Sequence, residues 1–282
     1  MSAAAEQIRD QQRSIWDEFS VGWRKWDAEV LGWYEPFGEA MIRDARLRPD
    51  SSVLDVASGT GEPGLATAAL VPEGSVVLTD ISEGMLRVAA EKAAVMGLER
   101  VRTVVSDAAA QPFDDDTFDA VFCRFGFMYF PDLSGAVQEM VRVARPGARI
   151  SAAVWSRAPE NPWASLIVGT IARHTELPVP LACAPGLFRC AAVGFMDRIF
   201  TEAGLLDVSE RKVSTDMVHE SPERYWEFMT DIAATVVMAL ARADEAGREL
   251  IRSDVFQMLG RYEHDGAVRL RSTATIVAGT KP

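Results

Sequence analysis

The chain has 282 residues, 48% of them hydrophobic, which is enough to bury a full core in one domain with insertions. Its net charge of −12 at pH 7 argues against a nucleic-acid substrate, because phosphate binding needs a basic face. The cysteines Cys123, Cys183 and Cys190 show no metal-ligand spacing, and no segment is as long and apolar as a membrane span. We therefore expect a cytoplasmic protein with reduced thiols, no metal and no membrane insertion.

Residues 1–48 are predicted to form an N-terminal helical cap. Apolar residues recur at helical spacing from Ile8 to Met41, and tryptophans are frequent among them. Aromatic side chains at this spacing usually pack inward. The alternative is that the cap closes over a ligand and offers it aromatic faces, with Trp23 as a contact.

Residues 49–156 alternate between apolar runs and helical patterns, which is typical of a parallel α/β sheet. Strands are predicted at 52–57, 75–80, 101–106, 118–124 and 148–155. Ligands of such sheets bind at the carboxyl ends of the strands. The polar residues expected at those ends are Asp55, Asp80, Asp107 and Arg124.

Residues 157–192 are predicted to form a lid or substrate insertion. The periodic pattern lapses into prolines here, and so long a stretch between elements is usually functional in a compact domain. We expect a helix over Asn161–Glu176 and a loop over 177–192 that covers the site.

Residues 193–282 are predicted to complete the core. A helical insertion at 216–261 interrupts this part, and its helices could also provide a homodimer interface. The expected elements are helices at 195–203, 222–240 and 245–259 and an antiparallel pair of strands at 205–215 and 267–279.

The stretch Ser52–Gly64 is predicted to be a strand, a tight loop and the start of a helix. Gly59, Gly61 and Gly64 satisfy the dinucleotide-binding pattern G-x-G-x-x-G, and Asp80 ends the next strand. An NAD(P)-dependent enzyme is therefore the first hypothesis.

Three residues of the loop oppose a diphosphate ligand. Asp55 ends the strand and Glu62 opens the helix, so a diphosphate would meet carboxylates, while Pro63 removes a possible N–H donor. The loop instead suits a cationic ligand without phosphate. S-adenosylmethionine meets that need, because its ammonium and sulfonium groups are both positive.

Five motifs follow one another between about residues 50 and 155. They are Val53–Gly64, Val76–Leu86, Ser106–Ala108, Phe113–Val121 and Arg142–Gly147, and the run Cys123–Asp132 accompanies them. In order and spacing they resemble the class I S-adenosylmethionine-dependent methyltransferases, and within these the ubiquinone/menaquinone-biosynthesis-like (methyltransferase type 11/25) branch. The resemblance implies a doubly wound, seven-stranded Rossmann-like sheet, here with an N-terminal helical cap and helical insertions.

The resemblance also suggests how the adenosyl half would be bound. Asp80 is placed to accept both ribose hydroxyls, which a carboxylate can do in a bidentate fashion. Asp107 would accept the adenine amino group while the Ala108 N–H donates to a ring nitrogen. Ile81 and Met85 would sandwich the adenine, although Met85 could simply belong to the core.

The remaining cofactor residues surround the glycine loop. Asp55 would orient the loop or accept from the ammonium, and Gly59 and Gly61 let the backbone approach the cofactor. Ala57 stands where many relatives have glycine. Arg124 could pair with one of the acids or contact the substrate.

Five aromatic residues are candidates for an apolar substrate chamber, with ordinary packing as the alternative. They are Trp23, Phe125, Trp155, Trp163 and Phe188.

The catalytic requirement depends on the methyl acceptor. A general base is needed only if the nucleophile holds a proton, and His174, in the predicted lid, is the first candidate, before His219 and His264. A carbon nucleophile would instead need aromatic faces, of which Trp155 is the candidate.

The predicted function is therefore methyl transfer from S-adenosylmethionine to a small, largely apolar metabolite, such as an aromatic, quinone-like or isoprenoid compound. The tryptophan-rich cap and helical insertion favour natural-product tailoring within that class. Two alternatives stay open: an NAD(P)-dependent oxidoreductase, and a non-catalytic protein of the same fold that binds the cofactor.

Overall fold

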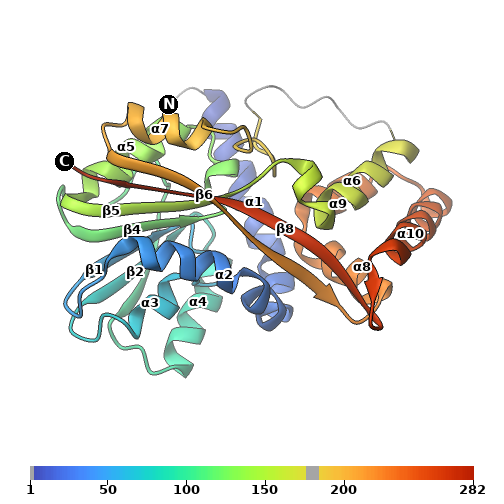
Figure 1. Cartoon of the computed structure of the whole chain (residues 1–282), viewed down its shortest axis with the longest axis horizontal. Coiled ribbons are helices and arrows are strands. Elements are labelled where there is room, and N and C mark those ends of the chain that lie inside the picture. The colour runs from blue at the N-terminus through green and yellow to red at the C-terminus, as the bar shows by residue number, and fades with distance from the viewer. Residues whose placement is uncertain (1–2, 176–183) are drawn as a thin grey trace.

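The computed structural model describes residues 3–175 and 184–282. Its central sheet has the strand order β3-β2-β1-β4-β5-β8-β6, with the short β7 paired to β8 (Figure 1). The strands are β1 (Ser52–Val56), β2 (Ser75–Asp80), β3 (Val101–Val105), β4 (Phe118–Arg124), β5 (Ala144–Trp155), β6 (Leu206–His219), β7 (Glu263–His264) and β8 (Ala267–Thr280).

The strands β1 to β5 are parallel, and β8 is antiparallel to both β5 and β6. The chain runs outward from β1 through β2 to β3 and then returns to β4 on the other side of β1. Such a reversal is the switch point at which open α/β sheets bind ligands. The predicted doubly wound sheet of the class I methyltransferase type is therefore confirmed, with seven main strands.

Helices cover both faces of the sheet. Figure 1 shows α2, α3 and α4 on one side and α5 and α7 on the other. These helices are α2 (Asp27–Ala45), α3 (Gly64–Ala68), α4 (Glu83–Val95), α5 (Leu133–Val143) and α7 (Phe195–Glu202).

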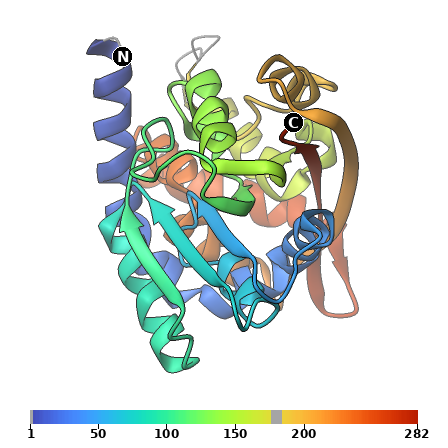
Figure 2. The ribbon, with the colours of Figure 1, turned by 90° about the vertical axis from the view of Figure 1, so that its left-hand side faces the viewer.

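The cap consists of α1 (Ala3–Lys25) and α2, as the helical spacing predicted. The helix α2 packs on β4, β5, β6 and β8, and its tryptophan, tyrosine and phenylalanine side chains are buried there. The helix α1 packs instead on α4, at the edge of the sheet that carries β2 and β3 (Figure 2). Of the two cap helices, α2 therefore covers the sheet itself, whereas α1 packs mainly on helices.

A second group of helices stands beyond the ends of the strands, at the far ends of the long β6 and β8 (Figure 1). It contains α6 (Pro162–His174), α8 (Pro222–Ile232), α9 (Ala234–Leu240) and α10 (Glu245–Leu259). The predicted helix over 222–240 is wrong in one respect, because it is broken at Ala233. The carbonyl of Ile232 accepts a hydrogen bond from the Trp23 indole at 3.2 Å, so the cap helix helps to fix the break.

Two strands extend well beyond one of their predicted ends. β5 begins at Ala144 rather than at 148, because Phe118 pairs with Ala144 before an irregularity in the ladder. β6 continues to His219 rather than ending at 215, because its last residues pair with the start of β8. The predicted end of the lid helix at Glu176 and the first part of the predicted lid loop, residues 177–183, lie outside the described residues.

Candidate active site

The carboxyl end of β1 carries a fully buried acid. The Asp55 Oδ2 accepts the Gly64 N–H at 2.9 Å, while its Oδ1 has no hydrogen-bond partner in the described part of the chain. The pKa of Asp55 is raised to about 7, chiefly by burial and to a smaller extent by the charges of Glu62 and Asp80, against the opposing effects of Arg124 and the Gly64 N–H. A cation bound next to Asp55 would therefore favour its ionised form and lower this pKa.

The next acid, Asp80, ends β2 and is also buried. Its Oδ2 accepts the Gly59 N–H and its Oδ1 the Ser82 N–H, both at 2.9 Å. Burial raises the pKa of Asp80 to about 6 even though these backbone donors lower it. Each carboxylate oxygen keeps a second lone pair, so both can still accept a hydroxyl.

The third acid, Asp107, follows β3 and shapes the turn after it. Its Oδ1 accepts the Ala109 N–H at 2.9 Å. Its Oδ2 is buried without a hydrogen-bond partner and lies 3.7 Å from Nη1 of Arg9, which comes from α1. Ala108 is buried beside it.

Among the described residues, four buried side-chain oxygens of the loop after β1 and the turn after β3 have no hydrogen-bond partner. They are Asp55 Oδ1, Ser58 Oγ, Asp107 Oδ2 and Gln111 Oε1. Buried polar atoms are nearly always hydrogen-bonded, and an exception is costly. A ligand that brings hydrogen-bond donors would remove this cost.

The amino end of α3 has no N–H group to spare. The first four N–H groups of this short helix already have acceptors, namely the Asp55 carboxylate for Gly64, the Gly61 carbonyl for Leu65, the Glu62 carboxylate for Ala66 and the Pro63 carbonyl for Thr67. A diphosphate would have to displace two carboxylates from this position. The geometry therefore strengthens the charge argument made from the sequence.

Arg124 ends β4 and faces the same group of acids. Its Nη1 donates to the Tyr34 carbonyl at 3.4 Å, and its guanidinium carbon lies 5.1 Å from the centre of the Tyr34 ring. Burial lowers the pKa of Arg124, and Glu62 and Asp55 oppose that shift. Arg124 thus offsets part of the negative charge and connects the loop to α2.

The loop itself needs unusual backbone angles. Gly61 has φ +108°, and a Cβ placed there would lie 2.6 Å from Cδ1 of Leu65. Ala57 adopts φ 55°, in the left-handed region, although it carries a Cβ. Its backbone is therefore strained.

We expect Ala57→Gly to raise the free energy of unfolding by about 1 kcal/mol, because glycine adopts this conformation without a steric penalty. Urea unfolding measures the change. The control Ala66→Gly, at an exposed position in α3, should destabilise by about the same amount. A lower stability of Ala57→Gly would contradict the strain argument.

The predicted adenine contacts differ in their accessibility. Ile81 is half-buried next to Asp80, as a contact would require. Met85 is 2% exposed within α4, and its N–H donates to the Ser82 Oγ at 3.1 Å. The alternative that Met85 belongs to the core is therefore favoured in this state.

Three of the predicted substrate residues pack together. Phe125 stacks on Trp155 with ring centres 4.1 Å apart and an angle of 11°, and Trp163 lies 4.8 Å from Trp155. Trp33 and Tyr34 of α2 complete the cluster. All five rings are buried, so their first role is packing between the cap and the sheet.

The other two aromatic candidates lie at the border of this cluster. Trp23 is half-buried, with its ring centre 6.2 Å from those of Trp16 and Tyr34. Phe188 is half-buried in the segment whose Gly186 N–H donates to the Met128 carbonyl, close to the turn after β4. Both stay proposals as substrate contacts.

His174 is the last residue of α6 and lies beside the insertion. Its Nε2 is 2.8 Å from Oδ2 of Asp254 on α10. It is eleven residues beyond Trp163 on the same helix, which places it about 16 Å along the axis from the aromatic cluster. The contact with Asp254 gives His174 a structural partner at this distance from the cluster, and its role as the base stays a prediction.

Several residues at the site were missed from the sequence. Ser58 belongs to the glycine loop and could have been selected from that motif. Arg9 on α1 and Tyr34 on α2 could not, because only the packing of the cap brings them to the strand ends.

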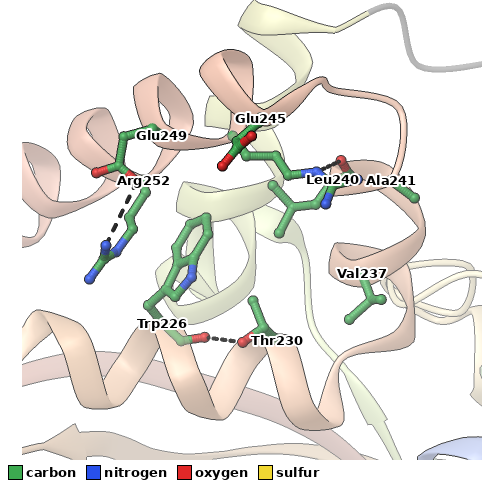
Figure 3. Close-up of a pocket in the computed structure, with 9 residues that line it drawn as sticks. Trp226, Thr230, Val237, Leu240, Ala241, Glu245, Glu249 and Arg252 are labelled. Atoms are coloured by element: carbon green, nitrogen blue, oxygen red, sulfur yellow. Dashed lines mark hydrogen bonds and ion pairs between the residues drawn. The ribbon is translucent and has the colours of Figure 1, made fainter.

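A separate hollow of about 520 Å³ lies within the insertion (Figure 3). It is lined from α8 by Trp226 and Thr230 and from α9 by Val237 and Leu240, and α10 supplies charged residues such as Arg252. Every lining residue belongs to α8, α9, α10 or the turn between α9 and α10. This hollow is therefore distinct from the group of acids at the strand ends.

Among the described helices, none combines the length and the apolar character needed to cross a membrane.

Residues 53–147 match the family model described as methyltransferase domain. A demethylmenaquinone methyltransferase of Shouchella clausii is 35% identical over 147 residues, which cover 50% of this chain and 63% of that protein. The ubiquinone/menaquinone biosynthesis C-methyltransferase UbiE of a Marinomonas species is 39% identical over 122 residues, 43% of this chain and 48% of that protein. The chain thus spans about half to two thirds of the length of these relatives.

A solved structure with a similar fold is a putative methyltransferase from Bacillus halodurans, with a TM-score of 0.57 at 22% identity, covering 87% of this chain and 98% of that one. This similarity concerns the fold. The motifs, the strand order and the matched domain agree with one another. The chain therefore carries a class I S-adenosylmethionine-dependent methyltransferase domain, related in sequence to the ubiquinone and menaquinone methyltransferases.

Proposed function

We propose that this protein transfers the methyl group of S-adenosylmethionine to a small, largely apolar acceptor. The observation that carries the proposal is that buried oxygens of Asp55, Ser58 and Asp107, at the strand ends, have no hydrogen-bond partner in the part of the chain that the structure describes. A ligand that fits them must bring several donors and no phosphate. An ammonium, an adenine amino group and two ribose hydroxyls supply such donors, and a sulfonium adds a positive charge without a phosphate.

The residues fit the two halves of such a ligand. Asp80 would hold the ribose hydroxyls, and Asp107 Oδ2 would accept the adenine amino group. At the amino-acid end, Asp55 Oδ1 and Ser58 Oγ are free to accept from the ammonium. Gly59 leaves open space, since a Cβ placed there would meet no atom within 4 Å.

When bound, S-adenosylmethionine supplies an electrophilic methyl group on a sulfonium centre. The protein's contribution is then to hold the acceptor in line at about 3 Å and to exclude water. The acids also favour the positive charge of the methyl donor. Tyr34 of α2 and Tyr129, which follows β4 in the chain, have hydroxyls whose pKa is raised by burial. Both therefore keep their protons and would donate hydrogen bonds to an oxygen of the methyl acceptor.

The acceptor class follows from the aromatic side chains. Trp16 and Trp23 of α1 and Tyr129 lie next to one another at the border of the aromatic cluster, with Trp16 5.1 Å from Tyr129. Such faces suit an aromatic, quinone-like or isoprenoid compound. The names of the sequence relatives favour a quinone-like acceptor, while the large helical insertion favours tailoring of a natural product.

The test is calorimetric titration with S-adenosylhomocysteine beside NADH. We expect micromolar binding of S-adenosylhomocysteine and no binding of NADH. Binding of NADH alone would overturn the proposal in favour of the oxidoreductase alternative.

Turnover then separates an enzyme from a non-catalytic binder of the same fold. Labelled S-adenosylmethionine is incubated with a panel of short-chain quinols, phenols and isoprenoids. Label in at least one acceptor is the expected result. Binding without transfer to any class would favour the non-catalytic alternative.

A further inference from the structure

An acid from the cap fastens α1 to the first turn of α4. Oδ1 of Asp17 accepts hydrogen bonds from the Ser82 Oγ at 2.6 Å and from the Gly84 N–H at 2.9 Å. Ser82 is the N-cap of α4, and its Oγ also accepts the Met85 N–H. The exposed carboxylate of Asp17 therefore binds Ser82, the capping residue of α4, which lies 65 positions later in the chain.

The two helices approach each other closely at this point. A Cβ placed at Gly84 would lie 2.7 Å from the Ser20 Oγ and 3.2 Å from Oδ1 of Asp17. Only glycine allows this contact without displacement. The sequence of α4 is thus adapted to the docking of α1.

The same contact leads to the acid expected to hold the ribose. The Ser82 N–H donates to Oδ1 of Asp80 at 2.9 Å. Because Asp17 also accepts the Gly84 N–H, it holds the backbone turn to which the Ser82 N–H belongs. A chain of hydrogen bonds therefore runs from Asp17 through Ser82 to Asp80.

Two further contacts join α1 to the segments that follow β3 and β4. Nη1 of Arg9 lies 3.7 Å from Oδ2 of Asp107, after β3. The Trp16 ring meets Tyr129 edge to face at 5.1 Å, after β4. One helix thus contacts the segments that follow β2, β3 and β4, and these segments surround the candidate cofactor site.

We propose that Asp17 is a positioning residue of the cofactor site, and that α1 is the wall of this site that lifts to let the cofactor enter and leave. The inference rests on the proposed function. Asp17 acts through Ser82 on Asp80, and Arg9 holds Asp107 while α1 is docked. The cofactor and α1 therefore stabilise each other.

The charge of Asp17 gives the inference a second consequence. The titratable groups that face Asp80 are Asp17 from α1, Asp55 from β1 and the Cys123 thiol from β4. Asp17 helps to raise the pKa of Asp80. A ribose prefers the ionised carboxylate, so affinity is complete above this pKa and is lost as the pH falls through it. Without the charge of Asp17 that loss should occur at lower pH.

The experiment compares Asp17→Asn with Glu18→Gln, which removes the same charge from the exposed neighbouring residue. The dissociation constant and dissociation rate of S-adenosylhomocysteine are measured from pH 5 to pH 8. For Asp17→Asn we expect about tenfold weaker binding at pH 7.5, faster dissociation, and a loss of affinity at lower pH than in the wild type. Glu18→Gln should match the wild type, and Asp17→Glu should restore most of the affinity.

Hydrogen exchange provides an independent readout. S-adenosylhomocysteine should slow exchange in α1 of the wild type and do so less in Asp17→Asn. If the wild type binds the ligand while Asp17→Asn shows the same affinity and the same pH profile, the inference is wrong and the proposed function stands. If the wild type does not bind it, both fall together.

Discussion

Replacing Asp80 by alanine is expected to weaken the binding of S-adenosylhomocysteine by about 2 to 3 kcal/mol, or about 30- to 150-fold. The carboxylate is buried and accepts two backbone N–H groups, one in the glycine loop and one at the start of α4. The substitution would remove the expected ribose contacts and leave both donors without their partner. Calorimetric titration at pH 7.5, above the pKa of Asp80 of about 6, measures the loss.

Two further variants make this result specific. Asp80→Asn keeps the size of the side chain but turns an N–H₂ group toward one of the two backbone donors, so it should also bind weakly. Glu73→Gln removes an exposed charge at the amino end of β2, away from the site, and should bind as the wild type does. Equal binding by Asp80→Ala and the wild type would exclude Asp80 from the cofactor site.

The framework of the site could be predicted because it depends on local sequence. The bounds of β2 and β4 were predicted correctly, since each is a short apolar run that ends at a polar residue. Ser82, a residue type that favours this position, caps the next helix. The carboxyl ends of parallel strands lie at one edge of a sheet, so the placement of Asp55, Asp80 and Asp107 followed from the strands alone.

The rest depends on contacts between distant segments. Nothing in the local sequence of Asp17 or Arg9 indicates that they meet residues near positions 82 and 107. The break at Ala233 was also hidden, because alanine is a good helix former and the apolar spacing continues across it. The Trp23 indole N–H donates a hydrogen bond to the Ile232 carbonyl, and this tertiary contact lies at the end of α8.

For the aromatic residues, residue type alone does not distinguish a substrate contact from a core position. A stripe of aromatic side chains in the cap and at the ends of β4 and β5 indicated either a chamber or a core. The stacking of Phe125 on Trp155 is core packing, whereas Trp16, Trp23 and Tyr129 remain at its border. Which ring meets the acceptor is decided by the docking of α1, and no periodicity contains that information.

Lowering the pH from 7 to 4 is expected to cost about 3 kcal/mol of stability through His219 alone. Its side chain is 6% exposed, its ring centre lies 4.7 Å from that of Phe228, and its Nε2 has no hydrogen-bond partner in the described residues. Burial, with a smaller effect of Arg224, lowers the pKa of His219 from 6.5 to about 4. As the pH falls below 6.5, His219 is protonated in the unfolded chain but stays neutral in the folded protein. Stability therefore declines until about pH 4, where the folded protein also takes up the proton.

The buried acids change stability in the opposite direction, so the test must be a difference. Because the pKa values of Asp55 and Asp80 are raised in the folded protein, the instability caused by their charges is relieved as the pH falls. Subtracting the urea-unfolding free energy of His219→Phe from that of the wild type at each pH cancels this contribution. The difference should fall by about 3 kcal/mol between pH 6.5 and pH 4. The same subtraction for His264→Gln, at an exposed position on β7, should stay constant, and a constant difference for His219→Phe would mean that the His219 ring is protonated without cost in the folded protein.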